Sequence, residues 1–490
     1  MNLINQMNES QNFYDVVVVG AGLSGIGAAF HLQDKCPNMS FTVLEGRSAI
    51  GGTWDLFKYP GIRSDSDMYT FGFSFFPWKN PQSIADGPSI LKYINETVDN
   101  FDLRKYIQFN RKVVEANWDS ESKSWSVEIL DKQNDEVQKI ECKFLFMCSG
   151  YYNYEKGYEP EFPNIEAFKG VKIHPQKWDE TLDYTDKNIV IIGSGATAVT
   201  LLPKLAEKAK KVTMLQRSPT YIMNLPQEDA LANFLKKVLP AQAAHQISRW
   251  KNILIGLGLY QVSRKYPNFV KNTLKKGIKK QLGEQYEDKH FSPKYNPWDQ
   301  RLCLVPDNDL FLSLKSGKGK IVTDTIKTFT ENGIVLDSGE TLDADIIVTA
   351  TGLDVQLFGG MKLSVDGKKI DTSQIHAYKG VMFSGIPNFA VSIGYTNASW
   401  TLKCDLNCFF VTRVLNYMKE RNFSTCIPRF DHENLKTERL LDFDANYILR
   451  AEKILPKQGS KAPWKVYQNY VKDVFALKYG SIEDKYLVYK

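Results

Sequence analysis

The stretch Val16-Val17-Val18-Val19-Gly20-Ala21-Gly22-Leu23-Ser24-Gly25 decides the fold of the N-terminal part of the chain. It is a continuous apolar run that ends in a GxGxxG turn, and a helical pattern follows through Leu32. Strands buried on both faces have unbroken apolar runs of this kind, which are typical of parallel sheets. A second strand then ends at Glu45, so the segment predicts a βαβ unit that binds a dinucleotide.

The residues of this turn have distinct roles in such a unit. Gly20 allows the tight turn, Gly22 lets the backbone approach a pyrophosphate, and Gly25 lets helix and strand pack closely. The helix N-terminus supplies N–H donors to the phosphates. Glu45 is placed to accept hydrogen bonds from the ribose hydroxyls of an adenosine. The alternatives are a purely structural glycine turn and an ordinary surface glutamate.

A second unit of the same kind begins at Asn188. Its apolar run ends in Gly193-Ser194-Gly195-Ala196-Thr197-Ala198, with alanine where the third glycine usually stands. Gly193, Gly195 and Thr197 are its candidate cofactor contacts. After its second strand the chain has Arg217 where the first unit has Glu45, and a guanidinium there suits a 2′-phosphate. This difference predicts NADPH rather than NADH, with a plain surface arginine as the alternative.

Composition limits the class of protein. The 490 residues carry 62 Lys and Arg against 56 Asp and Glu, with 43% hydrophobic residues, as in an ordinary soluble protein of two to four domains. A net charge of +6 is too dilute for a nucleic-acid surface. No apolar run is long enough to span a bilayer, and seven cysteines without a CxxC pair indicate a reducing compartment. We therefore expect a cytoplasmic protein with no metal site and no transmembrane segment.

The two units predict an α/β fold with two Rossmann-like dinucleotide-binding domains, the second inserted in the first. Apolar strands at Phe144–Met147 and Ile346–Val348 both end in small residues and glycine, on either side of the second unit. We expect a first domain over 1–150 and 345–490, the latter with a C-terminal segment, and a second over 151–344. Without a CxxC pair for dithiol chemistry, the first domain is expected to bind FAD and the second NADPH.

The region 227–295 has helix formers and lysines and no strand signal, which predicts a helical subdomain within the second domain. Its basic stretch around Lys271 and Lys280 is either a solvated face or a peripheral contact with a membrane.

A segment between the two units carries the most specific signal. Residues 168–179 match the pattern FxGxxxHxxxW(P/D), with Phe168, Gly170, His174 and Trp178 at the defined positions. This resembles the fingerprint of type I Baeyer–Villiger monooxygenases, a group of class B flavoprotein monooxygenases. The flavin-containing N- and S-monooxygenases have a similar segment in which an aromatic residue other than Trp is usual at position 178.

The resemblance extends over nearly the whole chain. The segments 51–54 and 59–69 look like the flavin-facing part of this family. Four further segments, 55–57, 295–303, 395–401 and 455–459, are similar to the mycobacterial ethionamide-activating monooxygenase group.

This resemblance implies an enzyme that uses FAD, NADPH and O₂ to convert ketones to esters or lactones through a C4a-peroxyflavin, and that also oxidises sulfides. It implies that Arg301 is the catalytic cation and that Asp65 pairs with it. A small apolar ketone or sulfide would be the substrate, and open-chain aliphatic ketones are favoured. Two alternatives stay open: a flavin-containing N/S-monooxygenase, and a non-catalytic FAD/NADPH redox sensor.

The resemblance also assigns further contacts to the flavin. Thr53, Trp54 and Asp55 are expected beside the isoalloxazine, and Thr401 is expected to open a helix whose N-terminus faces the flavin. His174 is expected to organise the segment that joins the domains rather than to donate a proton. Gln300 departs from the lysine that often precedes the catalytic arginine, which predicts weaker discrimination against NADH.

Overall fold

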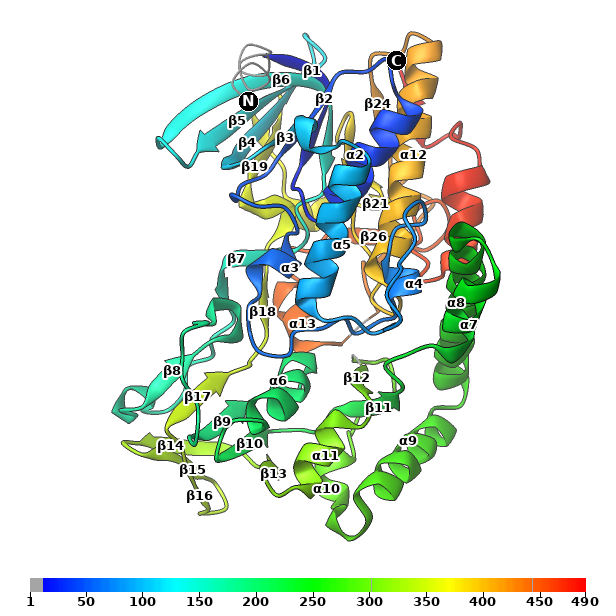
Figure 1. Ribbon diagram of the computed structural model, residues 1–490. Coiled ribbons are helices and arrows are strands. Elements are labelled where there is room, and N and C mark those ends of the chain that lie inside the picture. The colour runs from blue at the N-terminus through cyan, green and yellow to red at the C-terminus, as the bar shows by residue number, and fades with distance from the viewer. Residues whose placement is uncertain (1–11, 301, 443) are drawn as a thin grey trace.

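The computed structural model describes residues 12–300, 302–442 and 444–490, and Arg301 lies outside them. Its elements form two lobes, each built around one larger sheet (Figure 1). The first lobe holds the N-terminal glycine turn and the second lobe holds the Gly193 turn.

The first sheet has eleven strands and begins with the predicted βαβ unit. Strand β1 (Phe13–Val19) leads through the turn to helix α2 (Leu23–Lys35) and then to β2 (Phe41–Leu44). β1 pairs in parallel with β2 on one side and with β6 (Glu136–Met147) on the other. The apolar run of β1 is buried from Val16 to Val19, so both faces of this strand are covered as the sequence predicts.

The remaining strands of this sheet extend it on both sides. They are β3 (Ile107–Gln108), β4 (Arg111–Asp119), β5 (Ser124–Asp131), β19 (Lys362–Val365), β20 (Lys368–Lys369), β21 (Ala377–Tyr378), β22 (Met382–Phe383) and β23 (Phe389–Val391). Helices α2, α5 (Gly87–Asn100) and α12 (Trp400–Glu420) cover one face, with the short helices α3 (Thr53–Leu56) and α4 (Met68–Phe71) near their ends.

The second sheet contains five parallel strands in the order β13-β10-β9-β17-β8. β9 (Asn188–Ile192), α6 (Ala196–Ala206) and β10 (Lys211–Gln216) form its βαβ unit. The outer strands are β13 (Gly319–Thr323) and β8 (Val171–Ile173). Helix α11 (Asp309–Lys315) packs on α6, and β14 (Ile326–Thr330), β15 (Gly333–Leu336) and β16 (Thr341–Asp343) form a separate antiparallel sheet.

One predicted boundary is wrong. We expected the chain to re-enter the first domain at residue 345, but β17 (Ile346–Thr349) lies in the second sheet, between β9 and β8. An apolar strand that ends in glycine suits the middle of either parallel sheet equally well, and Ile346–Thr349 is fully buried here. The return to the first lobe therefore follows Gly352.

The two crossings between the lobes run side by side as an antiparallel pair. β7 (Tyr152–Gly157) leaves the first lobe and β18 (Leu353–Val355) returns to it. The Asn153 amide donates to the carboxylate of Asp354 at 3.0 Å, and the Thr351 hydroxyl donates to the carbonyl of Tyr158 at 2.6 Å. A two-stranded connection resists shear along its length while it still permits bending, because each strand supports the other.

The helical segment forms where the sequence predicts helices, but it contacts both lobes. It comprises α7 (Ala230–Val238), α8 (Ala241–Lys265), α9 (Pro267–Leu282) and α10 (Asp288–Phe291). α8 packs on α4 of the first lobe, whereas α9 packs on β11 (Tyr221–Leu225) and α11 of the second lobe. In Figure 1 these green helices run along one edge of the molecule past both lobes.

The other elements are short. They are β12 (Leu302–Pro306), α13 (Asn446–Ala451), α14 (Tyr470–Asp473) and the paired strands β24 (Cys426–Pro428) with β27 (Leu487–Tyr489) and β25 (Thr437–Arg439) with β26 (Lys457–Gly459). Among the residues described, none of the helices has the length and apolar character that a membrane crossing requires.

Candidate active site

A cavity of about 1250 Å³ extends from the Gly20 turn to the Gly193 turn. This exceeds the usual volume of a pocket for one small ligand, which is roughly 300–1,000 Å³. Its lining includes both glycine turns, the residues after β2 and β10, and the segment 62–65. The cavity therefore has room for ligands at both turns at once and brings their inner ends together.

The first turn has the geometry that its glycines predict. Gly20 has φ of +102°, and a Cβ there would lie 2.8 Å from the carbonyl oxygen of Cys148. A Cβ on Gly25 would lie 1.8 Å from the carbonyl oxygen of Gly20, so this glycine lets α2 pack on the turn and does not line the cavity. Gly22 lines the cavity opposite Gly52, where a Cβ would lie 3.1 Å from the Cα of Gly22.

Glu45 follows β2 and lies against the Gly20 turn. Its carboxylate accepts N–H groups from Ala21 at 2.7 Å and from Arg47 at 2.9 Å, and it lines the cavity. Burial raises the pKa of this carboxyl despite these two hydrogen bonds. Each carboxylate oxygen can accept a further hydrogen bond, so Glu45 retains acceptor capacity for hydroxyl groups.

The second turn has the same plan with more open space. Gly193 has φ of +137°, and a Cβ there would lie 2.3 Å from the carbonyl oxygen of Ala350. Gly195 has no atom within 4 Å of an added Cβ among the described residues. Thr197, in the first turn of α6, hydrogen-bonds the hydroxyl of Tyr59, and burial raises the pKa of that tyrosine to about 12. Gly193, Gly195 and Thr197 all line the cavity.

The end of β10 supplies a cation in place of a carboxylate. Gln216 is buried, and its amide donates to Thr323 at 2.8 Å and to the His290 carbonyl at 3.0 Å. Arg217, the next residue, lines the cavity. The buried amide fixes the end of the strand, and so holds Arg217 at the edge of the cavity.

Charged side chains also lie between the two turns. Asp65 and Gln300 line the cavity, while Arg301 lies outside the described residues. Arg63 of the same segment lines the cavity and makes an ion pair through Nη1 with Asp309 of α11. Its Nη2 is buried without a hydrogen-bond partner among the described residues. A buried donor left in this state lacks the hydrogen bond that a ligand acceptor would provide.

Of the four residues expected near the flavin, two line the cavity and two do not. Thr53 and Trp54 line the cavity, and the Thr53 hydroxyl is 3.4 Å from that of Tyr154. Asp55 points to Arg47 instead, with which it makes an ion pair at 2.5 Å, and it is not in the cavity lining. Thr401 is buried behind Trp400, and Trp400 rather than Thr401 reaches the cavity. Asp55 therefore does not face the ligand space directly, whereas Thr401 stands, as expected, in the first turn of a helix whose N-terminus reaches the cavity through Trp400.

The fingerprint residues lie outside the cavity lining, against the connection between the lobes. Phe168 belongs to one hydrophobic cluster of the second lobe, and Trp178 packs against a second hydrophobic cluster of the same lobe. A Cβ on Gly170 would lie 2.4 Å from the carbonyl oxygen of Asp345, which explains the glycine. These three residues therefore fix where the segment runs.

His174 packs on both crossings. A Cβ on Gly157 of β7, the residue that pairs with Leu353 of β18, would lie 2.0 Å from its ring, and its Nδ1 accepts the N–H of Gln176 at 3.2 Å. The Gln176 amide donates to the Asn153 carbonyl at 2.7 Å. Burial lowers the pKa of His174, so the ring is neutral near pH 7.

Sequence reasoning assigned no role to several lining residues. Arg63 and Tyr59 stand in a segment that was noted only for its resemblance to the family, and their position follows from Gly61, where a Cβ would lie 3.0 Å from Lys204 of α6. Trp400 and Arg450 come from the C-terminal part of the chain. The guanidinium of Arg450 lies 3.4 Å from the ring centre of Tyr158, a contact with no local sequence signal.

Comparisons with known proteins agree with this architecture. The family model described as flavin-binding monooxygenase-like matches residues 14–422. The FAD-containing monooxygenase EthA of Mycobacterium tuberculosis is 51% identical over 473 residues, which cover 96% of each chain. A probable FAD-binding monooxygenase, AlmA of Acinetobacter baylyi, is 51% identical over 96% of this chain and 95% of its own. The chain therefore belongs to the flavin-binding monooxygenase-like family.

A solved structure shows the same fold. The oxidised steroid monooxygenase bound to NADP superimposes with a TM-score of 0.71 at 22% identity, over 86% of this chain and 88% of its own. The predicted family resemblance, the two-domain α/β fold and the flavin monooxygenase class are confirmed by these matches.

Proposed function

We propose that the chain is an NADPH- and O₂-dependent Baeyer–Villiger monooxygenase that holds FAD at the Gly20 turn and NADPH at the Gly193 turn. The observation that carries this proposal is the single cavity, which is lined by both turns and by Asp65 between them. Relatives with 51% identity are FAD-containing or FAD-binding monooxygenases by name, which supports the assignment of FAD to this chain.

The residues at the first turn fit FAD. Gly22 and Gly52 leave no side chain between the backbone and a pyrophosphate, and the N-terminus of α2 points to the same space. Glu45 is held by two N–H groups and accepts the ribose hydroxyls. Thr53 and Trp54 contact the isoalloxazine ring of the flavin. Asp55 makes an ion pair with Arg47 and does not contact the ligand.

The residues at the second turn fit NADPH. Gly195 leaves open space beside the N-terminus of α6, where the pyrophosphate would accept backbone N–H groups. Arg217 binds the 2′-phosphate through a charge-assisted pair. Gln300 stands in the lining where a second cation would help, so the preference for NADPH over NADH depends mainly on Arg217.

The groups between the turns set the electrostatics of the reaction space. Bound FAD would take a hydride from NADPH and then activate O₂ for insertion beside a ketone carbonyl or addition to sulfur. Arg301 is assigned the role of fixed cation that stabilises the negative charge in this space, and Asp65 orients it. Arg63 adds a second guanidinium, anchored on Asp309, with one buried N–H group still available to an oxygen acceptor.

His174 is assigned a positioning role. It is neutral, buried and packed against both crossings, so its place suits the coupling of lobe orientation to cofactor binding and does not suit proton transfer to substrate.

The substrate is a small apolar ketone or sulfide, with open-chain aliphatic ketones favoured, and the enzyme works in the cytoplasm, where NADPH is supplied.

The test is oxygenation of a linear ketone and of a thioether by the purified holoenzyme with NADPH, with identification of the products. We expect an ester from the ketone and a sulfoxide from the thioether, each formed with one NADPH consumed. A sulfoxide without any ester would identify the enzyme as an N/S-monooxygenase. NADPH consumption that no substrate stimulates would support the redox sensor instead.

A further inference from the structure

Helix α8 has an inverted distribution of polar and apolar side chains. Surface helices of soluble proteins turn their apolar stripe inward and their polar side chains outward. In α8 the inward side carries His245, Ser248 and Arg249 beside the smaller apolar contribution of Ala244 and Ile253, and all five are buried. The outward side carries Ile247, Leu254 and Ile255, which are 48%, 58% and 61% exposed.

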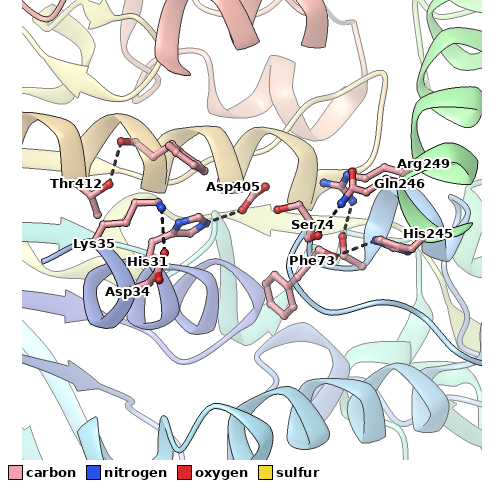
Figure 2. Close-up of polar contacts among 12 residues, drawn as sticks. His31, Asp34, Lys35, Phe73, Ser74, His245, Gln246, Arg249, Asp405 and Thr412 are labelled. Carbon is pink, nitrogen blue, oxygen red and sulfur yellow. Dashed lines mark hydrogen bonds and ion pairs between the residues drawn. The ribbon is translucent and has the colours of Figure 1, made fainter. Parts of the chain in front are cut away.

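The inward side is committed to the first lobe by hydrogen bonds. Arg249 donates through Nη1 to the carbonyls of Tyr69 at 3.0 Å and Gly72 at 2.7 Å, and the His245 ring lies 3.2 Å from the Phe73 carbonyl. Gln246 donates to the Ser74 carbonyl at 2.8 Å. Figure 2 shows these three side chains of α8 pointing together at the segment that contains Phe73 and Ser74. The rotation of α8 is therefore fixed, and its apolar side faces outward.

The apolar surface extends beyond α8. In α7, Leu231, Phe234 and Val238 recur at helical spacing and are all more than half exposed, and Phe269 at the start of α9 is 66% exposed. We call this surface of α7, α8 and the start of α9 the outer helical face. Single exposed apolar residues are normal, but a patch of this extent marks a site that contacts another apolar phase or protein.

The charge of the same segment identifies the partner. Residues 230–282 contain eleven Lys and Arg and no Asp or Glu, although the whole chain has nearly equal numbers of both. Seven of these lysines form no ion pair with a described residue: Lys236, Lys237, Lys265, Lys271, Lys276, Lys279 and Lys280. Lys265 lies about five turns after Ile247 on the same stripe of α8. Cations on the same helices as exposed aliphatic and aromatic side chains are features of a surface that binds anionic lipid headgroups.

We propose that the outer helical face docks the protein on the surface of an anionic phospholipid bilayer. The aliphatic side chains enter the headgroup and acyl boundary, and the lysines contact the lipid phosphates. A nucleic acid would use the lysines but would leave Leu254, Ile255 and Phe234 exposed to water. A second copy of this chain would bring like charges, such as those of Lys237 and Lys265, against one another, which opposes pairing through this face.

The docked face lies close to the proposed reaction space without lining it. The Asn252 side chain of α8 donates to Asp67 at 2.8 Å, two residues after Asp65. The cavity lining includes Asp65 but no residue from 230–282. Substitutions on the outer helical face therefore test docking without altering the residues assigned to cofactors or to catalysis.

The experiment is flotation of the purified holoenzyme with phosphatidylcholine vesicles, with and without phosphatidylglycerol. We expect the protein to float with the anionic vesicles, to stay behind with phosphatidylcholine alone, and to be released by salt because the lysine contribution is screened. The variant L254S/I255S should lower partitioning by about 10-fold for each side chain removed. The variant K237E/K265E, which reverses the charge of one exposed lysine of α7 and one of α8, should lower it by at least about 10-fold.

Matched controls come from the far side of the first sheet. V137S removes an apolar residue of β6 that is 62% exposed, and K368E/K369E reverses two exposed lysines of β20. Both should float as the unmodified protein does. Equal thermal stability and an unchanged far-ultraviolet circular dichroism spectrum show that each variant is folded.

Three results would overturn the proposal. The first is failure to float with anionic vesicles, and the second is equal loss of flotation in the control variants. The third is self-association that L254S/I255S abolishes, or nucleic-acid binding that lysine reversal abolishes, by a protein that does not bind vesicles. None of these readouts depends on the proposed reaction, so failure of docking and failure of the proposed function are distinguishable.

Discussion

The two glycine turns have the same backbone geometry, but the residues that follow the second strand of each unit have opposite charges. At the first, Glu45 follows β2 and is buried with its carboxylate on two N–H groups. At the second, Gln216 ends β10 with its amide buried, and Arg217 follows it into the cavity. The strand, turn and helix thus provide a general place for a pyrophosphate, and the residue after the second strand selects which adenosine it accepts.

The turns also differ in how closely they are packed. At Gly20 and Gly193 a Cβ would collide with the carbonyl of a neighbouring strand end. At Gly22 the backbone of Gly52 lies opposite, whereas at Gly195 the space is open. The first lobe's own backbone therefore comes close to the ligand space at Gly22, whereas no described residue does so at Gly195.

The largest effect is expected where the two sites meet. R301A removes the assigned cation, and D65N removes the carboxylate assigned to orient it. Each should lower product formation by about 10²–10³-fold, since that is the usual cost of a lost preorganised charge. Flavin reduction by NADPH should continue in both variants, as followed by anaerobic stopped-flow absorbance. Unchanged oxygenation in R301A would remove Arg301 from the mechanism.

The next effect concerns the far end of the second turn. R217A should raise KM for NADPH by about 10–100-fold, which corresponds to the loss of a hydrogen bond to a charged group. KM for NADH should change little, because NADH has no 2′-phosphate. Steady-state kinetics with both coenzymes measure this, and an equal rise for both would contradict the assignment.

A smaller effect is expected from G195A. The backbone conformation of Gly195, with φ of −76°, is one that any residue can adopt. An added Cβ would contact no atom in the described part of the chain. The fold should therefore be unaffected, while the methyl group obstructs the approach of the pyrophosphate and raises KM for NADPH about 10-fold. Flavin content and melting temperature serve as controls. Unchanged kinetics would place NADPH elsewhere.

The smallest effect concerns the pH dependence of the first site. Burial raises the pKa of Glu45, so its carboxylate becomes protonated at a higher pH than an exposed glutamate. Because the ionised form accepts the ribose hydroxyls, flavin affinity should fall as the pH decreases through this raised pKa. Ultrafiltration across a series of pH values measures the flavin retained. E45Q should bind flavin a few-fold more weakly at neutral pH and lose this dependence, and identical curves for both proteins would contradict the role of Glu45.

The parts of the fold that local sequence determines were predictable. Both βαβ units were found because the buried strand, the glycines and the helix are contiguous, and each has its own physical signature. The position of β17 was not, because Ile346–Thr349 suits the interior of either sheet and only long-range pairing with Ile189 and Val171 decides between them. Local patterns carry no information about such a choice.

The site was predictable to a similar extent. Glu45, Arg217 and the cavity-lining glycines follow strands whose ends the sequence reveals. Asp55 was expected at the ligand, yet it pairs with Arg47, because an ion-pair partner eight residues away along a loop is not visible as a pattern. Arg63 was overlooked because its partner Asp309 is 246 residues distant.

The most direct test of the central claim is the absorbance spectrum of the purified protein before and after anaerobic addition of NADPH. The account predicts a yellow protein with one FAD per chain, whose flavin band is bleached by NADPH and returns when air is admitted. A colourless protein that takes up no FAD on reconstitution, or a flavin that NADPH does not reduce, would contradict it.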